Sequence, residues 1–208
     1  MGFIPDVKEE RDRVTVTLGY YLPTTPAAAC FLAYTVFGDG TVLVRESMDI
    51  PEGLGTMPEF GAAFRMDADY DRISWYGLGP DETYADRTQG ARLGIWSQSV
   101  RDAMADYLVP QESGAKLGVR WAKVTDMRGR GLVFAGDRMM ISALPWSVHE
   151  IEQADHPYEL PRVCHTFVRV AKGQMGVGGD DSWGARPHSE FLLPDHGHVE
   201  FTFAFRGV

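Results

Sequence analysis

Residues 174–184, which read QMGVGGDDSWG, place two carboxylates and an indole on one glycine-rich segment. Glycine reaches backbone angles closed to other residues, and aspartate can bond its own nearby backbone, so Gly-Gly-Asp-Asp is typical of a loop. Trp183 is then carried at the tip or flank of that loop. An indole beside hydrogen-bonding groups offers a flat apolar surface that suits a sugar ring. The competing interpretation is that Trp183 fills a core, because tryptophan is highly buried on average.

Asp180 and Asp181 are the first candidates for acid–base chemistry. Glycoside hydrolysis needs two carboxyl groups that flank the scissile bond, about 5–5.5 Å apart when configuration is retained. Adjacent residues point in opposite directions on a strand, and in a turn at least one carboxylate bonds the backbone. We therefore expect Asp180 and Asp181 to support the loop, with Ser182 as a further hydrogen-bonding group. Ser182 lacks the Gly-x-Ser-x-Gly surroundings of an activated nucleophile.

Among the six histidines, His196 and His198 could present two imidazoles from one turn. Such a pair needs at least one further metal ligand, and the sequence shows none at metal-site spacing. The favoured interpretation is a solvated turn before the last strand, so no metal is assigned. Residues 176–179 are glycine-rich, but Gly-Lys-Ser/Thr and a following helix are missing, so we do not expect a phosphate site there.

Composition narrows the classes of partner. The 208 residues carry a formal net charge of −9 and a pI of about 5.1. Nucleic acids and anionic membranes need basic patches, so neither is expected as a partner. With neither a signal peptide nor a bilayer-spanning apolar run visible, we expect a cytoplasmic protein. Cys30 and Cys164 lie in apolar stretches and are expected to be small buried hydrophobes rather than a disulfide.

The elements that must position these groups are short strands. Apolar or alternating segments rich in β-branched and aromatic residues are separated by glycine, proline and aspartate. Gly38-Asp39-Gly40 predicts a hairpin between strands 31–37 and 41–50. Strands are also expected at 13–18, 60–66, 73–76, 92–97, 119–125, 131–134, 139–143, 164–170 and 199–205, with a hairpin around 127–130. Segments 100–108 and 148–154 could each form a helical turn or two, and Ser147 is an N-cap candidate for the second.

Many short strands joined by hairpin turns predict an all-β fold, a large two-layer antiparallel β-sandwich in which each strand buries one face. Without repeats, low-complexity tracts or a Pro/Ser-rich linker, residues 1–208 are assigned to a single domain. Trp75, Trp96, Trp121 and Trp146 lie in predicted strands or at their ends and are expected to pack in the core. The sequence lacks the alternation of strands and long helices that would build a (β/α)₈ barrel.

Two runs carry a resemblance to a known family. Residues 174–184 resemble the C-terminal segment of the large β-galactosidases of glycoside hydrolase family 2, a segment encoded as a separate small subunit in two-chain members. Residues 75–87, WYGLGPDETYADR, are similar to that family's Gly-x-Gly-Pro-x-Glu-Asn-Tyr-x-Asp-Arg signature. Thr83 departs from it by replacing the usual asparagine, as do Ala85 and Leu78 at positions where proline and arginine are frequent.

The resemblance extends over most of the chain. Residues 110–114, Pro-Gln-Glu-Ser-Gly, and residues 119–121 fall where the family has Pro-Gln-Glu-Asn-Gly followed by a strand, and residues 156–161, HPYELP, also match. The similarity runs from about Asp12 to the end, whereas residues 1–8 hold nothing like the family's opening segment. The resemblance therefore implies a supersandwich like that of galactose mutarotase, without its first strands. A sheet edge or apolar face would then be open, and self-association is expected.

The resemblance also implies which residues act. It places both catalytic glutamates in a (β/α)₈ barrel elsewhere in the enzyme, so no catalytic residue is expected in this chain. From the residues themselves, Glu82 and Asp86 with Arg87 are expected to form a structural hydrogen-bonded turn. Related full-length enzymes bind metals mainly outside this segment, so magnesium and sodium, if the full enzyme needs them, are not assigned here. No cofactor is assigned to this chain.

Trp183 is implied to be the indole that reaches the mouth of the barrel's active site and stacks on the galactoside, with Asp180 and Asp181 fixing its loop. The partner is then the catalytic barrel region or large subunit. The implied reaction removes terminal non-reducing β-D-galactose, as from lactose, with retention of configuration, and the chain alone is expected to be inactive. Two alternatives stay open: a free-standing carbohydrate-binding module, and an inactive structural domain of a related hydrolase that acts on another sugar.

Overall fold

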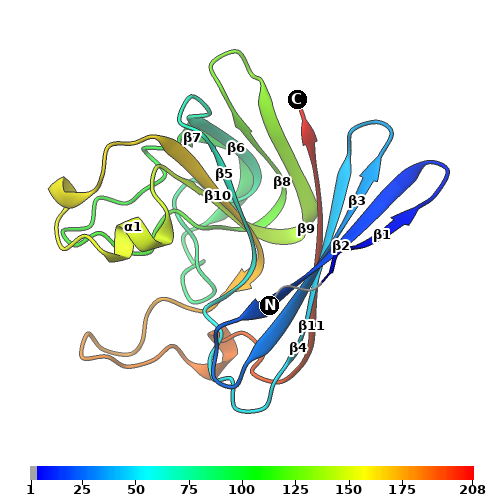
Figure 1. The fold of residues 1–208 in the computed structure, drawn as a ribbon. Coiled ribbons are helices and arrows are strands. Elements are labelled where there is room, and N and C mark those ends of the chain that lie inside the picture. Colours follow the sequence, from blue (N-terminus) through cyan, green and yellow to red (C-terminus); the bar gives the residue numbers. More distant parts are fainter. Residues whose placement is uncertain (1–3) are drawn as a thin grey trace.

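The computed structural model describes residues 4–208, which form an almost entirely antiparallel β structure (Figure 1). Its strands are β1 (Asp6–Glu9), β2 (Arg13–Leu22), β3 (Ala28–Phe37), β4 (Val42–Ile50), β5 (Glu59–Asp67), β6 (Arg72–Gly79), β7 (Arg92–Ser99), β8 (Lys116–Thr125), β9 (Gly131–Leu144), β10 (His165–Gln174) and β11 (Gly197–Gly207). The helical elements are α1 (Val148–Glu152), η1 (Pro157–Glu159) and η2 (Ser189–Phe191). The all-β prediction is confirmed.

The strands are hydrogen-bonded in the order β1-β2-β3-β4-β11-β9-β8-β6-β7, while β5 pairs with β10 and β10 pairs with β9. Figure 1 shows β1 to β4 and β11 on one side of β9, and β5 with β10 on the other. Side chains from both sides fill one core, in which the Phe64 ring of β5 lies 6.1 Å from the Phe203 ring of β11 and 5.1 Å from the Phe134 ring of β9. The predicted two-layer sandwich is therefore present.

β9 belongs to both layers because it bends in the middle. Residues 132–136 pair with β11, and residues 140–144 pair with β10. Arg138 lies at the change of partner with a φ of 49°, which is uncommon for a residue other than glycine. The predicted strands 131–134 and 139–143 are thus two halves of one 14-residue strand.

Both predicted hairpins are confirmed. In the first, Gly40 adopts a φ of 81° and the Thr41 amide donates to Asp39 Oδ1 at 2.9 Å. In the second, Asp126 Oδ1 accepts bonds from the amides of Arg128 and Arg130, at 2.8 and 3.0 Å. Short polar side chains that bond the backbone two residues ahead stabilise such turns, which is why the pattern was readable.

Of the two segments expected to be helical, one forms a helix and the other does not. Ser147 caps α1 as predicted, because its hydroxyl accepts from the Glu150 amide at 3.2 Å while the Glu150 carboxylate accepts from the Ser147 amide at 2.7 Å. Residues 100–108 instead form hydrogen-bonded turns that continue into irregular chain. None of the helices in residues 4–208 is long and apolar enough to cross a membrane.

The predicted burial of the cysteines and tryptophans is only partly confirmed. Cys30 is buried on β3, and burial raises the pKa of its thiol to about 12. The prediction for Cys164 is wrong: this residue is exposed, because β10 begins one residue later and the preceding segment lies on the surface. Trp75 and Trp146 are buried as expected. The other two, Trp96 and Trp121, are only half-buried.

The sheet ends expose apolar side chains. β7 is the last strand of the hydrogen-bonded order, and its Leu93 and Ile95 are exposed. Apolar edges of this kind favour pairing with another chain. Self-association remains a prediction that this surface supports.

Candidate functional site: an exposed indole above a buried turn

Trp183 lies on the long segment between β10 and β11, drawn in orange in Figure 1. Its side chain is 92% exposed. The interpretation of Trp183 as a core residue is therefore wrong, and contact with a ligand or partner stays open. An indole that gains nothing from burial within this chain is available to bind something outside it.

The two carboxylates beside Trp183 support its loop. Asp181 Oδ1 accepts from the amide of Trp183 at 2.8 Å and from that of Ala185 at 3.3 Å. Asp180 Oδ1 lies 2.9 Å from His188 Nε2, and the hydrogen bond to Asp180 raises the pKa of this imidazole. Ser182, between Asp181 and Trp183, is exposed. The pair therefore bonds the loop itself, which is a supporting arrangement rather than that of an acid and a nucleophile.

The base of the loop rests on the side chain of Asp86. The Gly178 amide donates to Asp86 Oδ2 at 2.8 Å, across 92 positions of sequence. A Cβ atom at Gly176 would lie only 2.6 Å from that oxygen, and one at Gly179 would collide with the backbone of Ala185. Glycine at 176 and 179 thus allows approaches that any side chain would block.

Asp86 belongs to the turn that follows β6. Tyr84 and Arg87 exchange backbone hydrogen bonds across this turn, and the Arg87 guanidinium donates to Glu82. Glu82 also accepts from the Tyr107 hydroxyl and the Gly114 amide, both at 2.7 Å. Burial tends to raise the pKa of Glu82, but these three donors outweigh it and hold the pKa below its usual range.

The predicted structural turn is therefore confirmed for Glu82 and Arg87. Asp86 instead bonds the loop of residues 176–188 that carries Trp183, called the tryptophan loop below. Sequence reasoning missed this contact. Thr83, the departure from the usual asparagine, is buried and bonds the start of β8. Its amide donates to the O atom of Ala115, just before β8, at 2.7 Å, and its hydroxyl accepts from the Leu117 amide at 2.8 Å. Threonine thus supplies the acceptor that attaches the turn to the sheet.

A buried ion cluster underlies the turn. Arg169 of β10 is 8% exposed and donates to Glu59 at 2.8 Å, to Glu112 at 2.6 Å and to the Ser142 hydroxyl at 2.9 Å. The Tyr84 hydroxyl donates to Glu112 at 3.3 Å. Burial opposes the charge on Arg169, but the two carboxylates dominate and raise its pKa. Both glutamates bind the same guanidinium, so the cluster connects strands rather than offering free acids.

Lys116 provides a second buried charge near the turn. Its Nζ donates to Pro80 O at 3.1 Å and lies 4.9 Å from the centre of the Trp75 ring. Burial lowers the pKa of this ammonium from 10.5 to about 8, against the opposing pull of Glu82 and Asp81. With 2% of its surface exposed, Lys116 is a structural cation rather than a ligand-binding one.

His196 and His198 bind different carboxylates and do not converge. His196 Nδ1 lies 2.5 Å from Asp195, and His198 Nδ1 lies 2.7 Å from Asp49 of β4. Within residues 4–208 no group of three or more His, Cys, Asp or Glu side chains could hold a metal ion.

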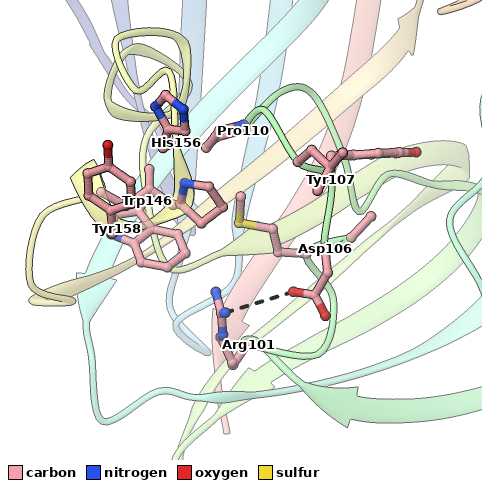
Figure 2. Close-up of a pocket in the computed structure, with 12 residues that line it drawn as sticks. Arg101, Asp106, Tyr107, Pro110, Trp146, His156 and Tyr158 are labelled. Carbon is pink, nitrogen blue, oxygen red and sulfur yellow. Dashed lines mark ion pairs between the residues drawn. The ribbon is translucent and has the colours of Figure 1, made fainter.

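A hollow of about 340 Å³, which sequence reasoning did not foresee, opens beside α1 (Figure 2). Trp146 lines it, with its indole N–H donating to Pro161 O at 2.8 Å and the Arg101 guanidinium 5.3 Å from its ring centre. Tyr158 is exposed at the hollow, stacked with His156. The walls of the hollow are mostly aromatic and aliphatic, so they suit contact with another apolar surface.

Known proteins resemble this chain along almost its full length. Residues 4–205 match the family described as "Beta galactosidase small chain". The chain is 42% identical to a β-galactosidase of Halalkalibacterium halodurans over 98% of its residues, and 39% identical to one of Streptococcus thermophilus over 95%. A β-galactosidase of Lactobacillus delbrueckii subsp. bulgaricus is 40% identical over 90%. The chain spans only 18–20% of the length of these relatives.

Among solved structures, a galactose mutarotase-like protein from Lactobacillus casei is similar over 98% of this chain and 73% of its own, with 12% identity and a TM-score of 0.46. A galactose mutarotase related enzyme from Lactobacillus acidophilus is similar over 98% of this chain and 71% of its own, with 10% identity and a TM-score of 0.41.

Proposed function

Because this chain belongs to the β-galactosidase small-chain family, we propose that it works as the C-terminal domain or small subunit of a β-galactosidase that hydrolyses terminal non-reducing β-D-galactose, as in lactose. The chain corresponds to about a fifth of the length of its relatives, so the proposal places the nucleophile and the acid–base group in a catalytic region outside it. This chain contributes Trp183 and a contact surface.

The observation that carries the proposal is the exposure of Trp183 on a loop that Asp86 holds at Gly178 and that Asp181 bonds internally. The apolar C–H faces of a galactoside can stack on the indole, which offsets the desolvation of a very polar ligand. Such stacking contributes about 1–2 kcal/mol, on the scale of aromatic contacts. This free energy changes affinity about tenfold. It does not hydrolyse a glycosidic bond.

The carboxylates of this chain support the assignment of chemistry to another region. Asp180 and Asp181 bond their own loop, and Glu59 and Glu112 share Arg169. A retaining glycosidase needs one carboxylate free to attack and one acid free to donate. We therefore expect the isolated chain to be inactive.

The proposed contact surface includes the hollow beside α1. The exposed side chains of Leu108 and Tyr158 line it together with Pro110, and the neighbouring Val109 is also exposed. In Figure 1 this region and the tryptophan loop both lie on the left of the molecule. Exposed apolar side chains on the side of Trp183 would dock the catalytic region where the indole is needed.

The test supplies the catalytic region of a close relative to this chain and measures cleavage of nitrophenyl galactoside. We expect activity only on mixing, and an increase of about tenfold in KM for Trp183→Ala, with a smaller increase for Trp183→Phe. Ile95→Ala, on the exposed edge strand β7, is the matched control. An unchanged KM for Trp183→Ala would remove the role of this residue. Activity on nitrophenyl glucuronide instead would favour the hydrolase of another sugar.

Titration calorimetry separates the free-standing carbohydrate-binding module from this proposal. A single stacking surface does not offset the entropy cost of association, so the chain alone should bind galactosides weakly or not at all. Measurable binding that Trp183→Ala abolishes would favour the module.

A further inference from the structure

We propose that Asp86 is the positioning residue for Trp183: its carboxylate fixes where the glycine loop presents the indole. The inference rests on the proposed role of Trp183 in galactoside binding. The bond joins two runs that are distant in sequence, because Asp86 lies in residues 75–87 and Gly178 in residues 174–184.

Asp86 supplies the anchor of the loop beyond Gly176. Below that point the loop is held by backbone bonds, from Met175 to Pro58 O at 2.9 Å and from Gly176 to Phe191 O at 2.8 Å. Within residues 4–208, the hydrogen bonds of residues 177–187 otherwise join residues of this segment to one another or join Asp180 to His188. The bond from the Gly178 amide to Asp86 is the exception. Loss of that bond would free the segment that carries the indole.

The anchor itself is rigid. Asp86 sits between Tyr84 and Arg87, which exchange backbone hydrogen bonds at 2.8 and 3.3 Å. Tyr84 is 1% exposed, and Arg87 is fixed by Glu82. Because the turn holds the Asp86 carboxylate in place, its bond to Gly178 fixes the exposed loop relative to the buried core.

Asp86 is poorly arranged for stability alone. Its Oδ1 is buried and finds no hydrogen-bond partner within the described residues, while Oδ2 serves Gly178. A buried acceptor without a partner costs free energy, and such atoms are uncommon in native proteins. Removing the carboxylate should consequently change the free energy of unfolding little, whereas it should make the loop around Gly178 more mobile. A purely structural residue would show the opposite pattern.

The glycines around Asp86 provide a matched pair of variants. A Cβ at Gly176 would lie 2.6 Å from Asp86 Oδ2, so Gly176→Ala must push the carboxylate away. A Cβ at Gly178 would lie 3.6 Å from the same oxygen, which is ordinary van der Waals contact. Gly176→Ala should therefore reproduce the effect of Asp86→Ala, and Gly178→Ala serves as its control.

The experiment measures KM and kcat for nitrophenyl galactoside with the catalytic region supplied. We expect Asp86→Ala and Gly176→Ala to raise KM several-fold, by less than Trp183→Ala, with a smaller change in kcat. Asp86→Asn keeps an acceptor oxygen for the Gly178 amide and should restore KM towards that of the unmodified chain. In the Trp183→Ala background, Asp86→Ala should add nothing, because its effect passes through the indole.

A second readout does not depend on activity. With 5-fluorotryptophan incorporated, the ¹⁹F resonance of Trp183 should narrow in Asp86→Ala as the loop becomes mobile, while the thermal midpoint of unfolding stays nearly unchanged. Trp183→Ala raising KM while Asp86→Ala changes neither KM nor the resonance would overturn the inference, as would a narrowed resonance with unchanged KM. If Trp183→Ala itself leaves KM unchanged, the proposed function fails, and the inference falls with it.

Discussion

The turn at residues 82–87 and the loop at residues 176–188 contain similar residues, but the turn buries its aromatic side chain and the loop exposes it. Both contain two carboxylates and one large aromatic side chain. Tyr84 in the turn is 1% exposed, whereas Trp183 in the loop is 92% exposed. The carboxylate of Glu82 binds groups from distant segments, while that of Asp181 binds its own backbone. The same chemistry thus builds a scaffold when it is shared across the fold and a presenting surface when it is kept local.

The largest effect should follow from breaking the scaffold at Arg169. Arg169→Ala removes a buried guanidinium and leaves the partly buried Glu59 and Glu112 without their cation, which should lower the free energy of unfolding by about 3–5 kcal/mol. Urea unfolding followed by circular dichroism measures this loss. Arg206→Ala, at an exposed position of β11, is the control and should be near neutral. Equal effects of the two changes would show that the cluster is not part of the scaffold.

Lys116 should make the scaffold sensitive to pH. Its folded pKa of about 8 is below the ordinary value of 10.5, so between these values the unfolded chain binds a proton that the folded chain has lost. Stability therefore rises with pH across this window, by about 3 kcal/mol from this group. The difference in unfolding free energy between the unmodified chain and Lys116→Met isolates the effect, because other titrations cancel. A difference independent of pH would contradict it.

The loop should respond to pH through His188, in the opposite sense. Asp180 raises the pKa of this exposed imidazole above 6.5, so the pair is complete at low pH and is lost as pH rises through the raised value. NMR titration of the ring should give a midpoint above 6.5 that returns towards 6.5 in Asp180→Asn. Asp181→Asn, which removes a carboxylate that binds only backbone, should leave the midpoint in place. No difference between the two variants would refute the pairing.

The smallest effect on stability should come from Trp183 itself. Because its indole is exposed, Trp183→Ala should change the free energy of unfolding by less than about 0.5 kcal/mol. Trp75→Ala removes a fully buried indole that donates to Leu78 O, and should cost about 3–5 kcal/mol. Thermal unfolding of the two variants compares them directly. A large loss for Trp183→Ala would mean that the ring supports the fold.

Sequence patterns placed most strands because alternation reports one buried face directly. Hairpins were equally accessible, since Gly40 and Asp39 act on neighbouring residues. The continuity of β9 was not, because a positive φ at Arg138 cannot be read from the residue type. Cys164 was misplaced for a related reason: an apolar neighbourhood predicts burial only where the strand has already begun.

The candidate site was predictable in its parts and not in its assembly. The loop character of Gly-Gly-Asp-Asp and the local bonds of Asp181 follow from residue chemistry. The bond between Asp86 and Gly178 spans 92 positions, so it depends on the fold that brings the turn after β6 to the loop after β10. Gly176 and Gly179 approach Asp86 and Ala185 too closely for a side chain, but the residue type alone does not identify these neighbours.

β9 has one further consequence. The backbone that completes one layer against β11 continues, through Arg138, into the backbone that receives β10, and β10 leads straight into the tryptophan loop. Neither layer can therefore come apart while the other stays intact, and the domain should melt as one cooperative unit. Amide protons of β4 and β10 would then exchange through a common global opening, and a single proteolytic nick at the bend of β9 would uncouple them.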